Sequence, residues 1–167
     1  ISPSGGIAGV LTHDGRALSR DRGDGFVSRI WLENDGDPAD QAQAALRPAW
    51  QEEGAGHAVE IAGVSIWHGR GAQAAREADA ACARHQIVII ANPPETARAA
   101  HFPDASGALW PAHPPLAAQA HTPFETCLFL TPESFRQTGS IALYDEGGSL
   151  RAVTAAQTQG SRIWSRQ

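Results

Sequence analysis

The chain has 167 residues, of which 42% are hydrophobic and 19% charged. These proportions allow a buried core and exclude a disordered protein, and the length fits one compact domain over residues 1–167. The 13 basic residues are all arginines, and with 18 acidic residues they give a formal net charge of −5. A negative chain lacks the simplest basis for strong nucleic-acid binding, so any contact with DNA is expected to be local or weak.

The sequence also bears on membrane association. No apolar run reaches the roughly 18 to 20 residues that cross a bilayer, and no basic region followed by an apolar stretch opens the chain. We therefore expect a soluble domain. Because the sequence begins at Ile1 rather than at a methionine, we also expect a fragment of a larger protein, whose remaining part is free to be membrane-bound.

The first elements expected along the chain are a hairpin and a strand. Asp14 and Gly15 form a strong two-residue turn signal after an apolar stretch, so residues 7–18 predict a hairpin. A loop of alternating charge with glycines follows at residues 19–25. The β-branched and aromatic residues at 26–32 then predict a strand.

A short helix is expected next. The acidic residues at 33–37 lack the spacing of a calcium loop, and a structural role fits them better. Asp37 is predicted to be the N-cap, with Pro38 as the first helical residue. From Pro38 the helix would continue through residues 41–46 and end near Pro48.

The middle of the chain predicts a strand, helix and strand in succession. Residues 59–68 alternate around a central glycine, which indicates a second hairpin or a bulged strand. Gly69, Arg70 and Gly71 complete neither common phosphate-binding pattern, so a plain strand-to-helix turn is favoured there. A helix over residues 72–84 and a wholly apolar strand over 86–91 follow, the second typical of a central strand in a parallel sheet.

Residues 92–126 lose all periodicity and are rich in proline and histidine, so a long irregular insertion is expected. Regular structure resumes with a strand at 127–130 and a short N-capped helix at 131–136. Segments 140–144 and 150–154 flank a glycine-containing turn and predict a hairpin. The sum is a single α/β domain: a mixed sheet with flanking helices and with hairpins at both ends.

Cys82 and Cys127 are too few for a disulfide framework and too far apart for a zinc knuckle. Two interpretations remain open from their spacing. They are either one disulfide in an oxidising compartment or two buried small hydrophobic residues.

The search for catalytic motifs finds little. The pattern GxSxG is absent, and no serine, histidine and acid are marked as a set. The metal motif HxHxDH is absent too, and every histidine stands alone. No cofactor and no metal are expected from these patterns, and catalysis is disfavoured.

The best candidates for nucleic-acid contact are four arginines near the start of the chain, with Phe26 and Trp31 among them. Guanidinium groups pair with phosphates and aromatic rings stack on bases, so the pattern suits single-stranded DNA. The alternative interpretation is a surface loop of salt bridges, because acidic residues are interspersed. The four residues are Arg16, Arg20, Arg22 and Arg29.

Several of these segments together resemble one family. They are DGRALS at residues 14–19, a run ending in WLENDGD at 31–37, the Cys82 helix followed by the apolar strand, and TGSIAL at 138–143 with RIW near the end. Their order and spacing, including the distance from Cys82 through the core strand to Cys127, resemble the C-terminal soluble domain of ComEC-type competence proteins. The likeness covers nearly the whole chain.

The resemblance implies a fold, a setting and partners. Family members are inner-membrane channels that carry single-stranded DNA into the cytoplasm, and the external domain resembled here is metallo-β-lactamase-like. It implies a periplasmic domain beside the transmembrane part of the same protein, and it favours the Cys82–Cys127 disulfide. Because HxHxDH is absent, we expect a degenerate and metal-free version of this domain.

Two main hypotheses follow. The first is a non-catalytic accessory domain of a DNA-uptake channel, with weak contacts to single-stranded DNA through the four arginines. The second is a metal-dependent nuclease or phosphodiesterase that degrades the non-imported strand, its site assembled from dispersed groups. Those groups are His57, His68, His101, Asp104 and His113. A purely structural module is the third possibility.

Overall fold

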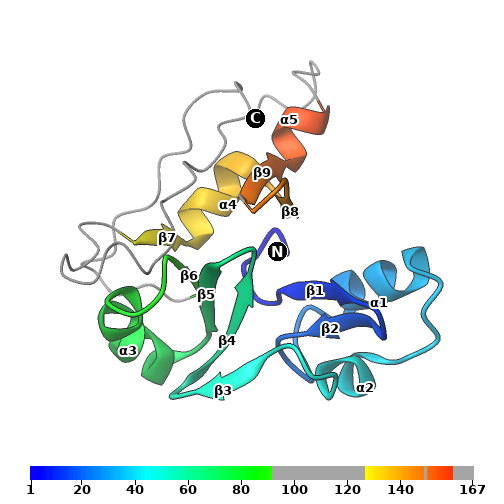
Figure 1. The fold of residues 1–167 in the computed structure, drawn as a ribbon, viewed down its shortest axis with the longest axis horizontal. Helices are drawn as coiled ribbons and strands as arrows, with labels where there is room; N and C mark the ends of the chain where they lie inside the picture. Colours follow the sequence, from blue (N-terminus) through cyan, green and yellow to red (C-terminus); the bar gives the residue numbers. More distant parts are fainter. Residues whose placement is uncertain (92–126, 149, 160–167) are drawn as a thin grey trace.

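A computed structural model describes residues 1–91, 127–148 and 150–159. A five-stranded sheet in the order β3-β4-β5-β6-β7 lies at its centre (Figure 1). Neighbours among the first three strands are antiparallel and among the last three parallel, which confirms the predicted α/β class with a mixed sheet. The strands are β3 (Gln51–Glu53), β4 (Gly56–Ile61), β5 (Val64–Gly69), β6 (Ile87–Ile90) and β7 (Leu128–Leu130).

Of the two alternatives predicted for residues 59–68, a hairpin or a bulged strand, the structure has the hairpin, formed by β4 and β5. Ala62 and Gly63 occupy the turn with φ of 51° and 73°, the left-handed pair that matches the twist of a two-residue hairpin. Farther along, the ring of Trp67 lies against Gly56 and Gly69, which face each other across the two strands. A side chain at either glycine would collide with that ring, so both positions need glycine.

Strand β6 is buried on both faces. Ile87 and Ile89 belong to the apolar cluster on one face, and Val88 and Ile90 belong to the cluster on the other. None of the four is more than 1% exposed. The prediction of a central parallel strand is confirmed, since β6 pairs in parallel with β5 and with β7.

Helix α3 (Ala72–Cys82) covers one face of the sheet. Ala74, Ala78 and Ala81 lie three or four residues apart and are fully buried, so they form one helical face. This face packs against Trp67 of β5 and against strand β6. The predicted helix is confirmed, and it ends two residues earlier than expected.

The start of the chain forms a unit of two strands and two helices, called here the N-terminal unit. It contains β1 (Gly9–Thr12), β2 (Gly15–Leu18), α1 (Gly25–Asn34) and α2 (Gln41–Ala45). The predicted hairpin is confirmed, but Thr12 pairs with Gly15, so the turn residues are His13 and Asp14. The core of this unit is small and consists of Ile7, Leu18, Leu32 and Ala44.

The strand predicted over residues 26–32 is wrong, because this segment lies in helix α1. Val27 and Ile30 favour a strand by propensity. Burial follows the helical spacing instead: Ser28 and Leu32, four residues apart, are the buried positions. Packing of this one face against the rest of the unit overrides the local preference.

The expected cap of the next helix is also wrong. Asp40, not Asp37, is the N-cap of α2: its carboxylate accepts from the Gln43 amide nitrogen at 2.8 Å, and the Gln43 side chain accepts from the Asp40 amide nitrogen at 2.9 Å. Asp37 accepts instead from the Ala39 amide nitrogen and pairs with Arg47. The prediction failed because an aspartate at position 37 and one at position 40 give the same N-cap signal in the sequence.

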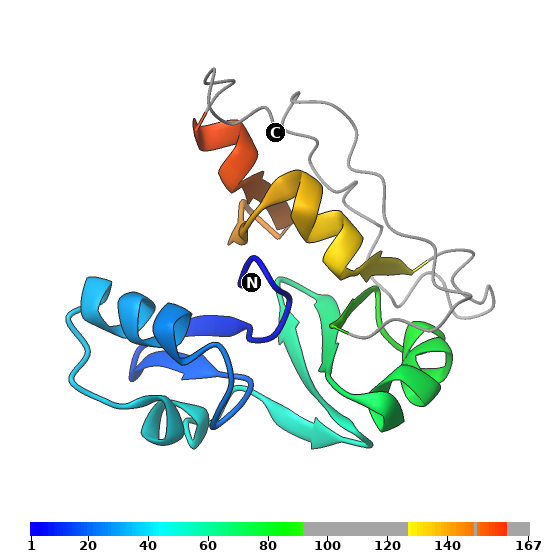
Figure 2. The same cartoon turned by 180° about the vertical axis from the view of Figure 1, so that it is seen from behind.

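The C-terminal part contains α4 (Pro132–Thr138), β8 (Ile141–Asp145), β9 (Leu150–Thr154) and α5 (Ala155–Gln159). Thr131 caps α4 and β8 pairs with β9, so the predicted short helix and second terminal hairpin are confirmed. The Ile141 amide nitrogen donates to the Ile1 carbonyl at 3.2 Å. Figure 2 shows the start of the chain between the β1–β2 hairpin and the β8–β9 hairpin.

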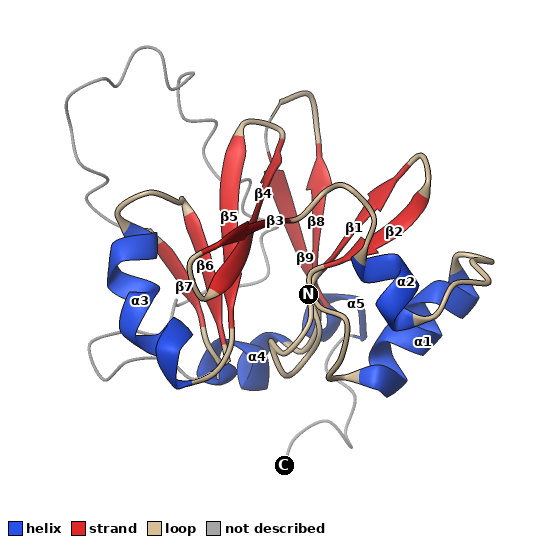
Figure 3. Cartoon of the chain, turned by 90° about the horizontal axis from the view of Figure 1, so that it is seen from below, coloured by secondary structure: helices blue, strands red, loops and turns tan. Residues whose placement is uncertain are grey.

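The layers are clearest from below. Figure 3 shows α3 at one side, α1 and α2 at the other, and the strands between them. Ile141 and Leu150 of the C-terminal hairpin and Ala8 before β1 pack on the sheet face opposite α3. Among the described residues, no helix is long and apolar enough to cross a membrane. The predicted insertion at 92–126 and the tail from residue 160 lie outside the described residues.

Candidate nucleic-acid interface

The four predicted arginines separate into two pairs. Arg16 gives two hydrogen bonds to the Asp35 carboxylate, at 2.6 and 3.0 Å, and its guanidinium lies 5.4 Å from the Trp31 ring centroid. Arg29 lies 3.5 Å from Glu33 on the same helix and 5.9 Å from the Phe26 ring. Both side chains have partners, so the salt-bridge interpretation fits these two positions.

Arg20 and Arg22 instead line a concave site, called here the cationic hollow, of about 410 Å³. It lies where the N-terminal unit meets β3, β4 and β5 of the sheet. A third arginine, Arg70 from the turn between β5 and α3, joins them. The lining residues are Ser19, Arg20, Asp21, Arg22, Ala45, Leu46, Glu52, Ala55, His57, His68 and Arg70.

The loop that carries Arg20 and Arg22 is anchored at both ends. Ser19 exchanges two hydrogen bonds with Ala8, one through its amide nitrogen and one through its hydroxyl. The Gln41 amide group donates to the Arg20 carbonyl at 3.3 Å and to the Gly23 carbonyl at 2.8 Å. These bonds fix the path of a loop that has no regular structure of its own.

A glycine makes room for the third arginine. Gly23 has φ of +93°, and a Cβ atom there would stand 2.7 Å from the Arg70 Nη1 atom. The Arg70 guanidinium therefore lies directly against the backbone of the loop that carries Arg20. Gly23 serves two purposes, the left-handed turn and the close approach of Arg70.

The hollow has a positive electrostatic character. Burial lowers the pKa of Arg20, and the nearby positive charge of Arg70 lowers it further. Within the described part of the chain, the guanidinium groups of Arg20 and Arg70 make no ion pair and no hydrogen bond. Three acids partly offset the charge: Asp21, 3.7 Å from Arg22, Glu52 on β3, and Asp24, whose negative charge acts on Arg20 together with that of Asp21.

Two histidines lie at the inner wall of the hollow. His57 and His68 are directly opposite each other on β4 and β5. His68 is 1% exposed, and its Nε2 atom donates to the Gly5 carbonyl at 3.0 Å, while Nδ1 has no partner among the described residues. Burial lowers the pKa of His68 to about 4 and also lowers the pKa of His57.

Two of the five dispersed groups of the nuclease hypothesis lie in the described residues. His57 and His68 come together, but His101, Asp104 and His113 lie outside the described residues. Over residues 1–91, 127–148 and 150–159, no group of three or more histidine, cysteine, aspartate or glutamate side chains is arranged to hold a metal ion.

Cys82 and Cys127 form a disulfide, with their Cα atoms 5.4 Å apart. It joins the last residue of α3 to the residue before β7, beside the apolar cluster under that helix. Of the two interpretations of these cysteines, the structure has the disulfide.

One polar set was missed by sequence reasoning, which found no serine, histidine and acid together. The Ser65 hydroxyl lies 2.6 Å from His85 Nδ1, and His85 Nε2 lies 3.0 Å from a Glu53 carboxylate oxygen. Burial raises the pKa of Glu53, but the hydrogen bonds from His85 and Arg84 outweigh it and the net pKa is lowered. The spacing of 53, 65 and 85 on three elements gave no local signal.

This set has the order of a hydrolytic triad but not its surroundings. The Ser65 amide nitrogen donates to the Gln86 side chain at 2.8 Å, so it is not free to stabilise an oxyanion. Ser65 also does not line the cationic hollow. We interpret the set as a clamp that joins β3, β5 and the end of α3.

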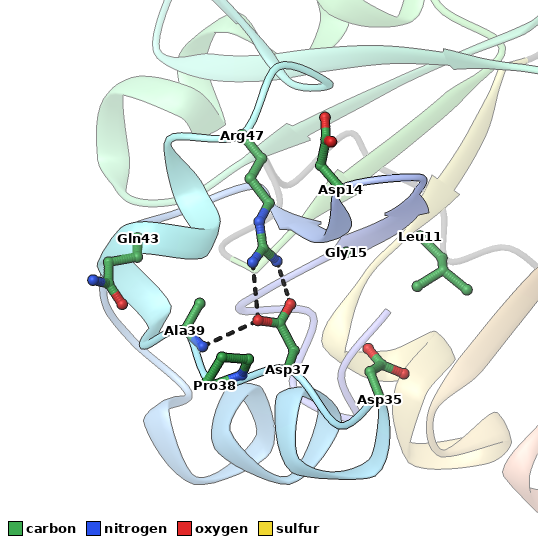
Figure 4. Close-up of a pocket in the computed structure, with 9 residues that line it drawn as sticks. All are labelled: Leu11, Asp14, Gly15, Asp35, Asp37, Pro38, Ala39, Gln43 and Arg47. Atoms are coloured by element: carbon green, nitrogen blue, oxygen red, sulfur yellow. Dashed lines mark hydrogen bonds and ion pairs between the residues drawn. The ribbon is translucent and has the colours of Figure 1, made fainter.

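A second hollow, beside the hairpin β1–β2, is acidic. Figure 4 shows the Asp37 carboxylate facing both the Arg47 guanidinium and the Ala39 amide nitrogen. The hydrogen bond from Arg47 is the largest cause that lowers the pKa of Asp37 to about 2. The other two carboxylates of the hollow are paired with residues outside it, Asp35 with Arg16 and Asp14 with His13. Because its charged groups all have partners, this hollow offers little to a ligand.

Comparisons of the chain with models of known protein families, with curated proteins and with solved structures give no match.

Proposed function

We propose that this chain is a non-catalytic accessory domain of a bacterial DNA-uptake channel, lying on the periplasmic side of the inner membrane beside the transmembrane part of the same protein. In this role it contacts single-stranded DNA as the strand passes. The observation that carries the proposal is the convergence of Arg20, Arg22 and Arg70 in one hollow, where Arg20 and Arg70 form no salt bridge within the described part of the chain.

Two further observations support it. The Cys82–Cys127 disulfide is the kind of bond that persists in an oxidising compartment such as the periplasm. The layered arrangement, with α3 outside the mixed sheet and the two terminal hairpins together with α1 and α2 on its other side, is compatible with a degenerate metallo-β-lactamase-like fold (Figure 3). Both agree with the resemblance that the sequence motifs gave.

The expected affinity for DNA is modest. The chain carries a net charge of −5, so repulsion from the rest of the surface opposes the attraction of the hollow. About three phosphate contacts in a single strand correspond to a slope of about −2 in a plot of log K against log salt concentration. The binding should also be independent of sequence, since phosphate contacts carry no base information.

Fluorescence anisotropy with a labelled oligothymidylate over a salt series tests the proposal. The wild type should bind with a slope near that value. The double variant Arg20→Ala, Arg70→Ala should lose at least tenfold in affinity and most of the slope. Arg136→Ala, an exposed arginine on α4 outside the hollow, is the matched control and should bind like the wild type. Equal binding by all three proteins would overturn the proposal.

A second comparison separates the predicted patch from the observed one. Replacing Arg16, Arg20, Arg22 and Arg29 together should weaken binding no further than replacing Arg20, Arg22 and Arg70. Incubation of the same DNA with manganese, magnesium or zinc should leave it intact. Cleavage that a chelator stops would contradict the non-catalytic assignment and favour the nuclease.

A further inference from the structure

We infer that the cationic hollow binds one phosphate group of a nucleotide, with Arg20 and Arg70 on the phosphate and a neighbouring hydroxyl or amino group of the same ligand donating to His68 Nδ1. This inference deepens the proposed function, since it identifies which part of a DNA strand the hollow recognises. It assigns a specific phosphate-binding site to the cationic hollow.

The two arginines provide the charge. Guanidinium groups form paired hydrogen bonds with phosphate oxygens, and these bonds are strongest where the group is partly removed from water. Arg20 is half-buried, and the Arg70 guanidinium is held against Gly23. Two like charges brought this close repel each other, and a phosphate anion bound between them would reduce that repulsion.

The buried histidine restricts the ligand further. The Gly5 carbonyl can only accept, so His68 Nε2 carries the proton and Nδ1 presents a lone pair. Buried acceptors almost always have a partner, and Nδ1 has none in the described part of the chain. A phosphodiester has no hydrogen to donate, so in DNA the donor must be a base N–H group or the free hydroxyl of a terminal sugar. This requirement distinguishes a nucleotide from an anion without hydrogen, such as sulfate.

Size and lining agree with one nucleotide. A volume of about 410 Å³ lies at the lower end of the range for small-molecule sites, so the hollow suits one nucleotide and not a run of several. Leu46, at the end of α2, is 86% exposed and lines the same hollow. It supplies an apolar surface for a sugar or base beside the arginines that would hold the phosphate.

His57 links the site to pH. Burial lowers its pKa, Glu52 opposes this effect, and Arg20 adds to it, with a smaller opposing contribution from Asp21. A phosphate bound between the arginines brings negative charge close to the His57 ring. Binding should therefore raise the pKa of His57, a change that a distant site would not produce.

Titration of the full chain with deoxyadenosine 5′-monophosphate, with inorganic phosphate and with oligonucleotides bearing either a 5′-phosphate or a 5′-hydroxyl tests the inference. Imidazole NMR signals and calorimetry give the readouts. The monophosphate should bind at least fivefold more tightly than inorganic phosphate, compete with DNA, shift the His68 Nδ1 resonance and raise the pKa of His57. A stronger effect of the 5′-phosphate would identify a strand end as the natural ligand, and equal affinities would identify an internal phosphodiester.

Variants give the remaining arms. Arg70→Ala should lower the affinity for the monophosphate at least tenfold. Arg70→Lys should lower it by less, and Arg136→Ala should leave it unchanged. If DNA binds through Arg20 and Arg70 while the monophosphate neither binds nor competes, the inference is wrong and the proposed function stands. If the monophosphate binds in the hollow but DNA does not bind, the inferred phosphate site is correct and the proposed function is wrong. Binding of the monophosphate unaffected by Arg70→Ala would also overturn the inference.

Discussion

The five-stranded sheet and the N-terminal unit are stabilised by different means. In the sheet, β6 buries all four of its residues between two apolar clusters, and the disulfide closes the region beside α3. The N-terminal unit has a core of only four buried residues, and its segments are held by charged and polar contacts. Those contacts include Arg16 with Asp35 and Arg47 with Asp37.

The difference explains where the candidate site lies. A rigid apolar sheet supplies the fixed wall with His57 and His68, whereas the polar unit supplies a shaped loop with Arg20. Trp50 connects the two regions: its indole nitrogen donates to the Ala17 carbonyl at 3.2 Å, and its ring lies 6.3 Å from that of His68. The hollow exists only while the two regions are docked.

The largest expected effect concerns the sheet region. The disulfide spans a sequence separation of 45, and in the chain-entropy model closing such a loop contributes about 4 kcal/mol to the free energy of unfolding. Cys82→Ser with Cys127→Ser should lower that free energy by about this amount in urea titrations. The wild type measured with and without a reductant provides the control. A loss well below 1 kcal/mol would show that apolar packing alone holds α3 and β7 together.

The second effect is a pH dependence that arises from His68. Its pKa is about 4 in the folded chain, chiefly because of burial, and about 6.5 when unfolded. The unfolded chain thus binds more protons between these values, so stability falls with decreasing pH from 6.5 to 4, by about 3 kcal/mol in total. Urea titrations at several pH values measure the loss. An NMR midpoint for the His68 ring near 6.5 would contradict it.

The same contrast governs what the sequence could predict. The apolar strand β6, the alanine face of α3 and the hairpin turns have local signals, and each was predicted at nearly its observed position. Helix α1 was not, because only one face of it is buried, through Ser28 and Leu32, and that face depends on packing against the rest of the N-terminal unit. Asp37 and Asp40 carry the same capping signal, and only the tertiary contact with Arg47 separates them.

The candidate site was half predictable. Arg20 and Arg22 were singled out from their charge, but Arg70 lay in a turn whose glycines matched no complete motif. Nothing in the sequence indicates that Gly23 leaves room for Arg70 or that His57 faces His68 across two strands. Such pairings arise from strand register and loop path, which are long-range properties.

A third test addresses the polar clamp of the sheet region. Ser65→Ala removes the hydroxyl 2.6 Å from His85 Nδ1, and His85 is only 5% exposed. A buried acceptor left without a donor costs about 1 to 3 kcal/mol, and the free energy of unfolding should fall by that amount. Ser65→Thr keeps the hydroxyl and is the control. An unchanged midpoint in urea for Ser65→Ala would mean that water replaces the hydroxyl.

The smallest effect is expected in the N-terminal unit. Asp40→Ala removes the carboxylate that accepts from the Gln43 amide nitrogen in the capping box of α2, which should cost about 1 kcal/mol, whereas Asp40→Ser keeps a side-chain acceptor and should cost much less. Because Gln41 on the same short helix holds the loop of Arg20, the alanine variant should also weaken single-stranded DNA binding. Urea titration and anisotropy on the same two variants check both effects. Lost stability with unchanged binding would show that the loop keeps its path without α2. The sheet alone would then position the arginines of the cationic hollow.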